Sequence, residues 1–229
     1  MIFKQLFDIK SSTYTYIISS GKGREALIID PVIDNTDEYI NLLKNLDLKL
    51  VKVIDTHIHA DHVSGLNELS KRTKCSKIMG EQSSSEVLDI RIKDNEKIKI
   101  ENIELISIYT PGHTDCSYSF LMNDKVFTGD TLLINGTGRT DFQNGNALDQ
   151  YESIFKKLLK LPEKTLVYPA HDYNGQKYST IRNEKNNNPR LQVTSAEEYI
   201  KIMNNLKLDD PKMMNIAITA NKKGVTLDQ

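Results

Sequence analysis

The chain has 229 residues, of which 38% are hydrophobic and 27% are charged, a balance typical of a folded globular protein rather than a disordered one. Its 30 basic and 31 acidic residues give a formal net charge of -1, which argues against an electrostatic surface for nucleic acid. No apolar stretch approaches the roughly 20 residues of a membrane span, and the N-terminus has no signal-peptide core. We therefore expect a cytoplasmic protein that forms a single domain over residues 1–229 and binds neither nucleic acid nor a membrane.

The first 75 residues predict a β-hairpin followed by helices and one buried strand. The expected strands span residues 13–18, 25–30 and 50–55, and helices are expected to begin at residues 35 and 62. Asn35 and Glu38 have the spacing of a capping box, which predicts a helix start. The strand 50–55 ends two residues before His57 and would deliver that side chain to the edge of a sheet.

The remainder of the chain mixes short strands with helices. The expected strands span residues 77–79, 97–100, 103–109, 118–122, 125–128 and 165–168, and helices are expected at 147–161 and from 195. Pro162 would end the first of these helices, and Ser195 with Glu198 forms a second capping-box pattern. The chain begins with strands and continues with strands and helices mixed. This order predicts a layered α/β fold with antiparallel strands.

Three of the five histidines fall within six residues, in the run His57-Ile58-His59-Ala60-Asp61-His62. The run follows a predicted strand, and a strand end is a rigid base from which several side chains can meet at one point. Imidazole nitrogens suit zinc, iron and nickel, and a carboxylate adds a hard oxygen ligand. The run therefore indicates a metal site.

The other ligand-type side chains repeat this arrangement. His113 follows a strand and a Pro-Gly turn, Asp130 follows a strand and Gly129, and His171 lies just beyond the strand 165–168. A single histidine, or one aspartate in a turn, is usually structural. The combination is different, because all five histidines occupy turns at strand ends, and together they predict a metalloenzyme.

The two cysteines, Cys75 and Cys116, form neither a CxxC pair nor a disulfide framework. Free cysteines are commonly buried, so we interpret both as structural thiols. Cys116 lies three residues after His113, which places it near the site without making it a ligand.

The run His57–His62 resembles the HxHxDH signature of the metallo-β-lactamase superfamily, and the later histidine, aspartate and histidine occur in the order of that superfamily. The resemblance covers most of the chain. It implies a four-layer αββα sandwich, an α/β fold with the metal at the ends of the sheets.

Several further segments resemble the persulfide dioxygenases within that superfamily. They are residues 11–16, 129–133, 138–143, 168–173 and 188–191, and the closing helical segment 202–206. The related glyoxalase II thioesterases share the metal motif, but they carry a longer C-terminal helical region than this chain holds.

The resemblance implies one Fe(II) per chain, held by His57, His113 and Asp130. Two histidines and one carboxylate form a facial triad that leaves positions on the metal open for two substrates. The implied substrates are glutathione persulfide and O2, with water, and the implied products are sulfite and glutathione.

The remaining ligand-type residues match those that complete a two-metal centre in binuclear relatives. They are His59, Asp61, His62 and His171, and in the dioxygenases they are expected to orient the ligands and water instead. Arg139, Tyr173 and Arg190 are the candidates for binding glutathione, because its carboxylates need guanidinium or hydroxyl partners. The resemblance also implies a homodimer.

Three other functions compete with this interpretation. The main alternative is a hydroxyacylglutathione hydrolase of the glyoxalase II type, which cleaves a thioester with metal-activated hydroxide. A binding protein on a decayed scaffold conflicts with the complete ligand set. A nuclease of the same superfamily conflicts with the near-neutral charge.

Overall fold

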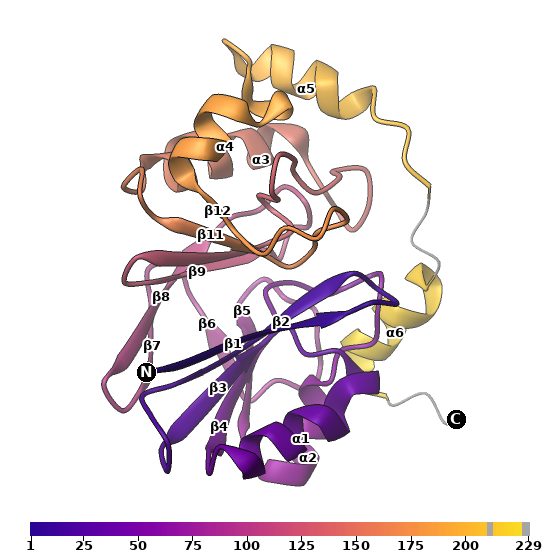
Figure 1. Ribbon diagram of the computed structural model, residues 1–229. Helices are drawn as coiled ribbons and strands as arrows, with labels where there is room; N and C mark the ends of the chain where they lie inside the picture. The colour runs from indigo at the N-terminus through magenta and orange to yellow at the C-terminus, as the bar shows by residue number, and fades with distance from the viewer. Residues whose placement is uncertain (210–212, 226–229) are drawn as a thin grey trace.

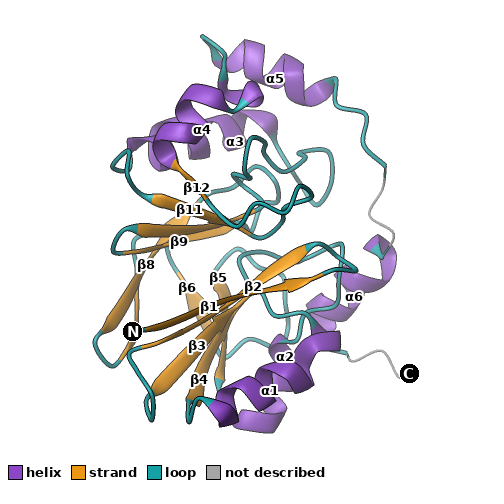
Figure 2. Ribbon diagram, viewed as in Figure 1, coloured by secondary structure: helices purple, strands orange, loops and turns teal. Residues whose placement is uncertain are grey.

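Two six-stranded sheets pack face to face, with helices on their outer sides, in a computed structural model that describes residues 1–209 and 213–225. Figure 2 shows the two sheets between an upper and a lower group of helices. This is the expected four-layer αββα sandwich, and the expected fold class is confirmed. The single-domain assignment stays a prediction.

The first sheet has the strand order β1-β2-β3-β4-β5-β6. Its strands are β1 (Ile2–Asp8), β2 (Thr13–Ser19), β3 (Glu25–Ile29), β4 (Lys49–Ile54), β5 (Ser76–Gly80) and β6 (Ile90–Ile92). The first three strands pair antiparallel, whereas β3, β4, β5 and β6 are parallel. The predicted hairpin is therefore confirmed, because β2 and β3 are its two strands. The helices α1 (Thr36–Asn45), α2 (Leu66–Thr73) and α6 (Met214–Lys223) lie on this half of the molecule (Figure 1).

The second sheet has the order β12-β11-β10-β9-β8-β7. Its strands are β7 (Lys97–Ile100), β8 (Ile103–Tyr109), β9 (Tyr118–Met122), β10 (Lys125–Gly129), β11 (Leu166–Pro169) and β12 (Ser179–Thr180). Among the described strands of this sheet, β10 and β11 pair in parallel and the other neighbours pair antiparallel. The helices α3 (Ala147–Glu152), α4 (Ile181–Asn187) and α5 (Ala196–Asn204) cover this sheet (Figure 1).

Three apolar clusters fill the spaces between the four layers. The central cluster joins residues of both sheets, such as Ile18 and Ile54 of the first and Phe120 and Phe127 of the second. A second cluster lies between the first sheet and helices α1 and α2, and a third lies between the second sheet and helices α3 and α5. Strand β2 is buried along its whole length, because it packs on both faces. The burial of both faces holds the strand ends, and the loops that come after them, in fixed positions.

The predicted capping box at Asn35 is wrong. A 3-10 turn at Ile33–Asn35 leads into α1, and the Asn35 side chain accepts no bond from the helix. Its amide instead donates to Asp8 Oδ1 at 3.1 Å, so a contact from β1 replaces the cap. At Ser195 the hydroxyl does accept from the Glu198 amide, which confirms that helix start.

Two other boundaries differ from expectation, and five elements were not expected. Helix α2 begins at Leu66 rather than residue 62, because the preceding segment forms the loop that carries the histidine run. The helix expected over 147–161 is regular only in α3 and continues as a π turn (Ser153–Lys157) and a 3-10 turn (Leu158–Lys160). Strands β1, β6 and β12 and helices α4 and α6 were not predicted as elements.

Candidate metal centre and substrate cleft

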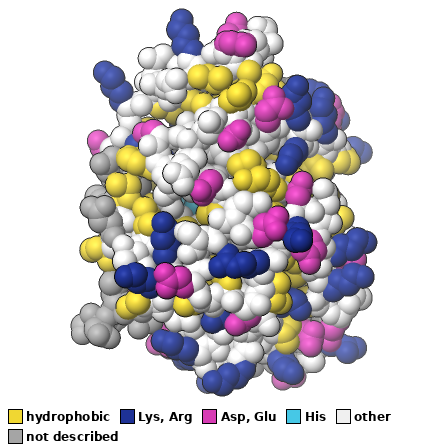
Figure 3. All heavy atoms as spheres, turned by 180° about the vertical axis from the view of Figure 1, so that it is seen from behind, with side chains coloured by type: hydrophobic (Ala, Val, Ile, Leu, Met, Phe, Trp, Pro, Cys, Tyr) yellow, Lys and Arg dark blue, Asp and Glu magenta, His cyan; other side chains and the backbone are white. Residues whose placement is uncertain are grey.

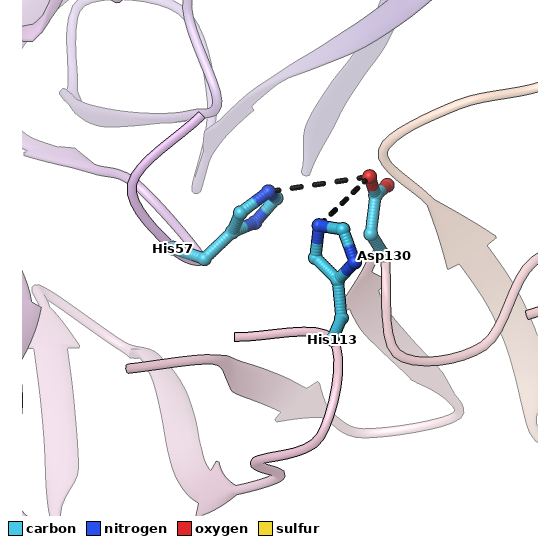
Figure 4. Close-up of side chains that lie close together, drawn as sticks. All are labelled: His57, His113 and Asp130. Carbon is cyan, nitrogen blue, oxygen red and sulfur yellow. Dashed lines mark ion pairs between the residues drawn. The ribbon is translucent and has the colours of Figure 1, made fainter. Parts of the chain in front are cut away.

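Two imidazoles and one carboxylate converge where the strands end. His57 lies in the loop after β4, His113 follows β8, and Asp130 follows β10. Figure 4 shows both imidazoles directed at the Asp130 carboxylate, whose Oδ2 lies 4.0 Å from His57 Nε2 and 3.5 Å from His113 Nε2. Donor atoms about 2.1 Å from a shared metal lie about 3 to 4 Å apart. The three side chains are therefore spaced as ligands of one ion.

Burial and neighbouring charges favour the protonation states that bind a metal. Burial, together with the nearby His59 and His113, holds the pKa of His57 well below its usual value, so His57 is neutral at pH 7. Burial alone would raise the pKa of Asp130, but the surrounding imidazoles of His171, His113 and His57 lower it instead. Neutral imidazoles and an ionised carboxylate are the forms that coordinate metals.

A second group of ligand-type side chains adjoins the first. His62 Nδ1 lies 2.7 Å from Asp61 Oδ2, and His171 Nε2 lies 3.4 Å from the same oxygen and 3.7 Å from Asp130 Oδ2. His59 Nδ1 lies 3.9 Å from Asp61 Oδ1. Burial opposes the charge on His171, but Asp130 and Asp61 raise the pKa of that imidazole to about 10. A metal in this second position would therefore release a proton from His171.

Three buried polar atoms around the centre fit the presence of a cation. His59 Nδ1, His62 Nε2 and Asp130 Oδ1 are shielded from solvent and have no hydrogen-bond partner among the described residues. A buried polar atom without a partner costs about 1–3 kcal/mol, so such atoms are rare unless something occupies their lone pairs. The orphaned Asp130 oxygen belongs to the first group of side chains and the two orphaned imidazole nitrogens to the second, so the residues present fit a metal in either position.

Two imidazoles of the centre are held by contacts that the sequence did not reveal. Thr56 Oγ1 donates to Asp30 Oδ2 at 3.0 Å and lies 3.0 Å from His57 Nδ1. Asp30 Oδ1 also lies 3.2 Å from His59 Nε2 and accepts the Thr56 amide at 2.7 Å. Such contacts fix the tautomer, leaving the opposite nitrogen free for the metal. Asp30 lies at a strand end beside Pro31, but no local spacing connects it to histidines 27 or more residues away.

Each predicted substrate-binding side chain lines one cleft of about 520 Å³ that opens from the metal centre. Arg190 donates to the carbonyl and hydroxyl oxygens of Thr137, while Arg139 binds the Asp141 carboxylate at 2.7 Å and lies over the Phe142 ring. Tyr173 is 73% exposed, and its ring stacks parallel to His171 with centroids 6.2 Å apart. The structure therefore brings the three residues to the same cleft as His113, Asp130 and His171.

Both thiols are buried and unpaired, as expected. Cys116 Sγ lies 3.4 Å from Thr114 Oγ1, and its side chain packs with the cluster under the first sheet. Burial raises the pKa of the Cys116 thiol, which keeps it protonated.

A family model described as "Metallo-beta-lactamase superfamily" matches residues 9–171. The chain belongs to this superfamily. The mouse persulfide dioxygenase ETHE1 is 41% identical over 226 residues, which cover 97% of this chain and 88% of the mouse protein. This superfamily member therefore belongs to the persulfide dioxygenase family.

Similarity to this chain differs between a solved ETHE1 structure and a hydrolase of the same superfamily. The crystal structure of ETHE1 from Myxococcus xanthus superposes with a TM-score of 0.94 at 44% identity, covering 97% of this chain and 98% of that one. The hydroxyacylglutathione hydrolase of Dictyostelium discoideum is 30% identical over 192 residues, which cover 78% of this chain and 70% of that protein. Identity to the hydrolase is lower and spans less of the chain.

The surface of this metallo-β-lactamase-fold protein carries charges of both signs. On the face shown in Figure 3, lysine and arginine side chains are interspersed with aspartate and glutamate. Within the described part of the chain, no helix has the length and apolar character needed to cross a membrane.

Proposed function

We propose that this protein is an iron-dependent dioxygenase that converts glutathione persulfide, O2 and water to glutathione, sulfite and two protons. The observation that carries the proposal is the convergence of His57, His113 and Asp130 at the head of the cleft lined by Arg139 and Arg190. The similarity to persulfide dioxygenases across nearly the whole chain supports it.

One Fe(II) per chain would be held by His57, His113 and Asp130. Such a triad occupies one side of the ion and leaves the other side open. When bound, ferrous iron supplies the electrons that activate dioxygen. The protein contributes position and charge: His113 and Asp130 line the cleft, so the reacting sulfur of a bound persulfide would meet the centre from that side.

His59, Asp61, His62 and His171 are proposed to orient the ligands and water rather than to bind iron. Asp61 lies within hydrogen-bonding distance of both His62 and His171, and burial of its carboxyl is outweighed by these imidazoles, which hold its pKa well below the usual value. An ionised carboxylate between two imidazoles can accept a hydrogen bond from each of them. Asp61 can thus fix both rings, and His171 Nδ1 is further placed 3.1 Å from the Ser12 carbonyl.

Arg139, Tyr173 and Arg190 are proposed to bind the glutathione part of the substrate. Two guanidinium groups suit the two carboxylates of glutathione. The exposed Tyr173 would cover the bound peptide from the side of His171. The homodimer expected from the resemblance belongs to the same proposal and can be measured by light scattering.

A hydroxyacylglutathione hydrolase is the second candidate. One observation favours it: the structure brings together all the side chains that a two-metal hydrolase needs, with Asp130 between His113 and His171.

The mouse and human relatives are named as mitochondrial, and a cytoplasmic location stays a prediction for this chain.

Oxygen uptake by protein purified without oxygen distinguishes the two candidates. We expect about one iron per chain and rapid uptake with glutathione persulfide, matched by sulfite formation. Two metals per chain, cleavage of a glutathione thioester and no oxygen uptake would instead establish the hydrolase. Other small persulfides, tested in parallel, define the carrier.

A further inference from the structure

The C-terminal helix α6 places one side chain directly on the backbone of the histidine loop. Asn221 Oδ1 accepts the Ser64 amide at 2.8 Å, and its Nδ2 donates to the carbonyls of His59 and His62, both at 3.0 Å. Acceptor and donor atoms of this amide are thus all used on a loop about 160 residues earlier in the chain. Figure 1 shows α6 returning to the half of the molecule that holds the first sheet.

Helix α6 is fixed in one position against this half. Its residues Ala217 and Ala220 are buried and pack with Val63 of the loop. The Ser85 hydroxyl donates to the Asn221 carbonyl at 3.2 Å, and the Glu86 amide donates to the next carbonyl of the helix at 2.8 Å. These contacts hold the Asn221 side chain in register with the loop.

The helix end adds a second restraint. Gly224 ends α6 with a positive φ of 64°, and a Cβ atom at this position would lie 2.6 Å from Val87. The Gly224 carbonyl accepts a hydrogen bond from the Asn67 side-chain amide at 2.5 Å. Glycine is the residue that adopts this conformation without strain, and here it also allows the close approach.

The loop between β4 and α2 needs such restraints because it forms neither a helix nor a strand, and an isolated bridge pairs only its Ser64 with Val32 among the described residues. Buried backbone groups outside helices and sheets must find partners elsewhere. By bonding both carbonyls, Asn221 fixes the distance between the peptide groups of His59 and His62. Their rings stand 4.3 Å apart, and each keeps one nitrogen without a partner among the described residues.

We propose that Asn221 is a positioning residue of the metal centre, and that α6 is therefore part of the site although it lies beyond the matched family region, residues 9–171. The side chain acts through the backbone of His59 and His62 and touches no substrate. Removal of a group that contacts a ligand typically changes metal affinity by about 10- to 100-fold, and Asn221, which acts through the neighbours of the proposed ligands, should fall at the lower end of this range.

The test replaces Asn221 by aspartate, which keeps the shape and an oxygen for the Ser64 amide. Both donors are lost, and a carboxylate oxygen would face the carbonyls of His59 and His62. We expect the Kd for Co(II), a spectroscopic probe of ligand geometry, to rise about 10-fold or more in Asn221→Asp. The visible spectrum of bound Co(II) should also change, and in the iron-loaded enzyme kcat should fall while KM stays the same.

Two further variants make the result decisive. Ile216→Ala on the same helix is the matched control, because this side chain is 48% exposed, and its Co(II) affinity and spectrum should equal those of the wild type. Ser85→Ala removes the bond to the Asn221 carbonyl and should change both readouts in the same direction by a smaller factor. If Asn221→Asp does not fold, the Ser85→Ala result decides alone.

A purely structural role predicts a different pattern. It would lower the melting temperature of Asn221→Asp and Ser85→Ala while leaving the Kd for Co(II) and its spectrum unchanged, and that result would overturn the proposal. The inference rests on the proposed function only in requiring a metal at this loop. Co(II) binding is measured without persulfide, so a protein that lacks dioxygenase activity can still confirm or refute the role of Asn221.

Discussion

The backbone carbonyl of Arg139 lies 2.8 Å from Nδ1 of His113. This contact occupies Nδ1 and leaves Nε2 of His113 facing the candidate metal position beside Asp130. The Arg139 side chain lines the cleft, so one residue supports a ligand with its backbone and faces the substrate space with its side chain. The segment around Arg139 therefore couples the metal centre to the cleft.

Gly138 allows this coupling, and its replacement should disrupt it. A Cβ atom at Gly138 would lie 2.2 Å from the Asp130 carbonyl and 2.8 Å from His113 Nδ1, so Gly138→Ala must displace both ligands. Because displacements near 1 Å in an active site cost about 100-fold in rate, we expect a comparable loss of kcat/KM and weaker iron binding. Steady-state kinetics and iron analysis measure both effects.

Gly136→Ala is the matched control for this prediction. The atoms nearest to a Cβ at Gly136 lie 3.9 and 4.0 Å away, which is ordinary contact. We expect near wild-type activity and iron content. Equal activity of Gly138→Ala and Gly136→Ala would show that the close packing around Gly138 does not position the ligands.

Asp130→Ala should abolish iron binding. Asp130 supplies the one carboxylate of the proposed triad, and its Oδ1 is buried without a partner among the described residues. The loss should exceed the roughly 10- to 100-fold effect of outer contacts. Iron per chain after anaerobic loading is the measurement, and Asp124→Ala in an exposed turn, 66% exposed at its side chain, is the control. Full iron content in Asp130→Ala would exclude it as a ligand.

The side chains of the candidate metal centre could be placed together from the sequence because each lies within a few residues of the end of its own strand, whereas the choice of three of them as iron ligands came from the family resemblance. His113 and Asp130 needed only the local pattern of a strand, a glycine turn and a donor. Asp30, Gly138 and Asn221 could not be found in this way, since they reach the histidines only through the packing of distant elements. Sequence spacing indicates the order of groups along the chain, but it does not indicate which backbone atoms meet when distant segments pack together.

The same limit explains the wrong prediction at Asn35. The capping-box spacing was present, but Asp8 on β1 binds the Asn35 amide, and no local pattern encodes that contact. The number of metal ions does not follow from these local patterns either, because the donors of a one-metal site and those of a second site lie next to each other in the structure.

Arg190→Ala should raise the KM for glutathione persulfide about 10-fold and leave kcat nearly unchanged. A hydrogen bond to a charged group contributes about 1.5–3 kcal/mol, and partial solvent access reduces this value here. Arg190 also binds Thr137, so a modest loss of thermal stability is expected. Arg182→Ala, at a side chain 59% exposed and paired with Glu163, is the control. An unchanged KM in Arg190→Ala would remove it from the substrate site.

Asp8→Asn should destabilise the protein more at neutral pH than below about pH 3.8. Burial alone would raise the pKa of Asp8, but hydrogen bonds from the amide and hydroxyl of Ser11 and from Asn35 lower it below 3.8. A lowered pKa means that the folded state favours the carboxylate. The stability it contributes is therefore complete above about pH 3.8 and is lost as the pH falls through the folded-state pKa.

We expect Asp8→Asn to lower the free energy of unfolding by about 1–2 kcal/mol at pH 7, and the difference from the wild type to shrink below about pH 3.8. Urea denaturation of both proteins at pH 7, 5 and 3.5 measures it. Asp34→Asn, which removes an exposed ion pair with Lys10, should change the stability by less than about 1 kcal/mol. A difference for Asp8→Asn that stayed constant from pH 7 to 3.5 would mean that its carboxylate charge does not stabilise the turn after β1.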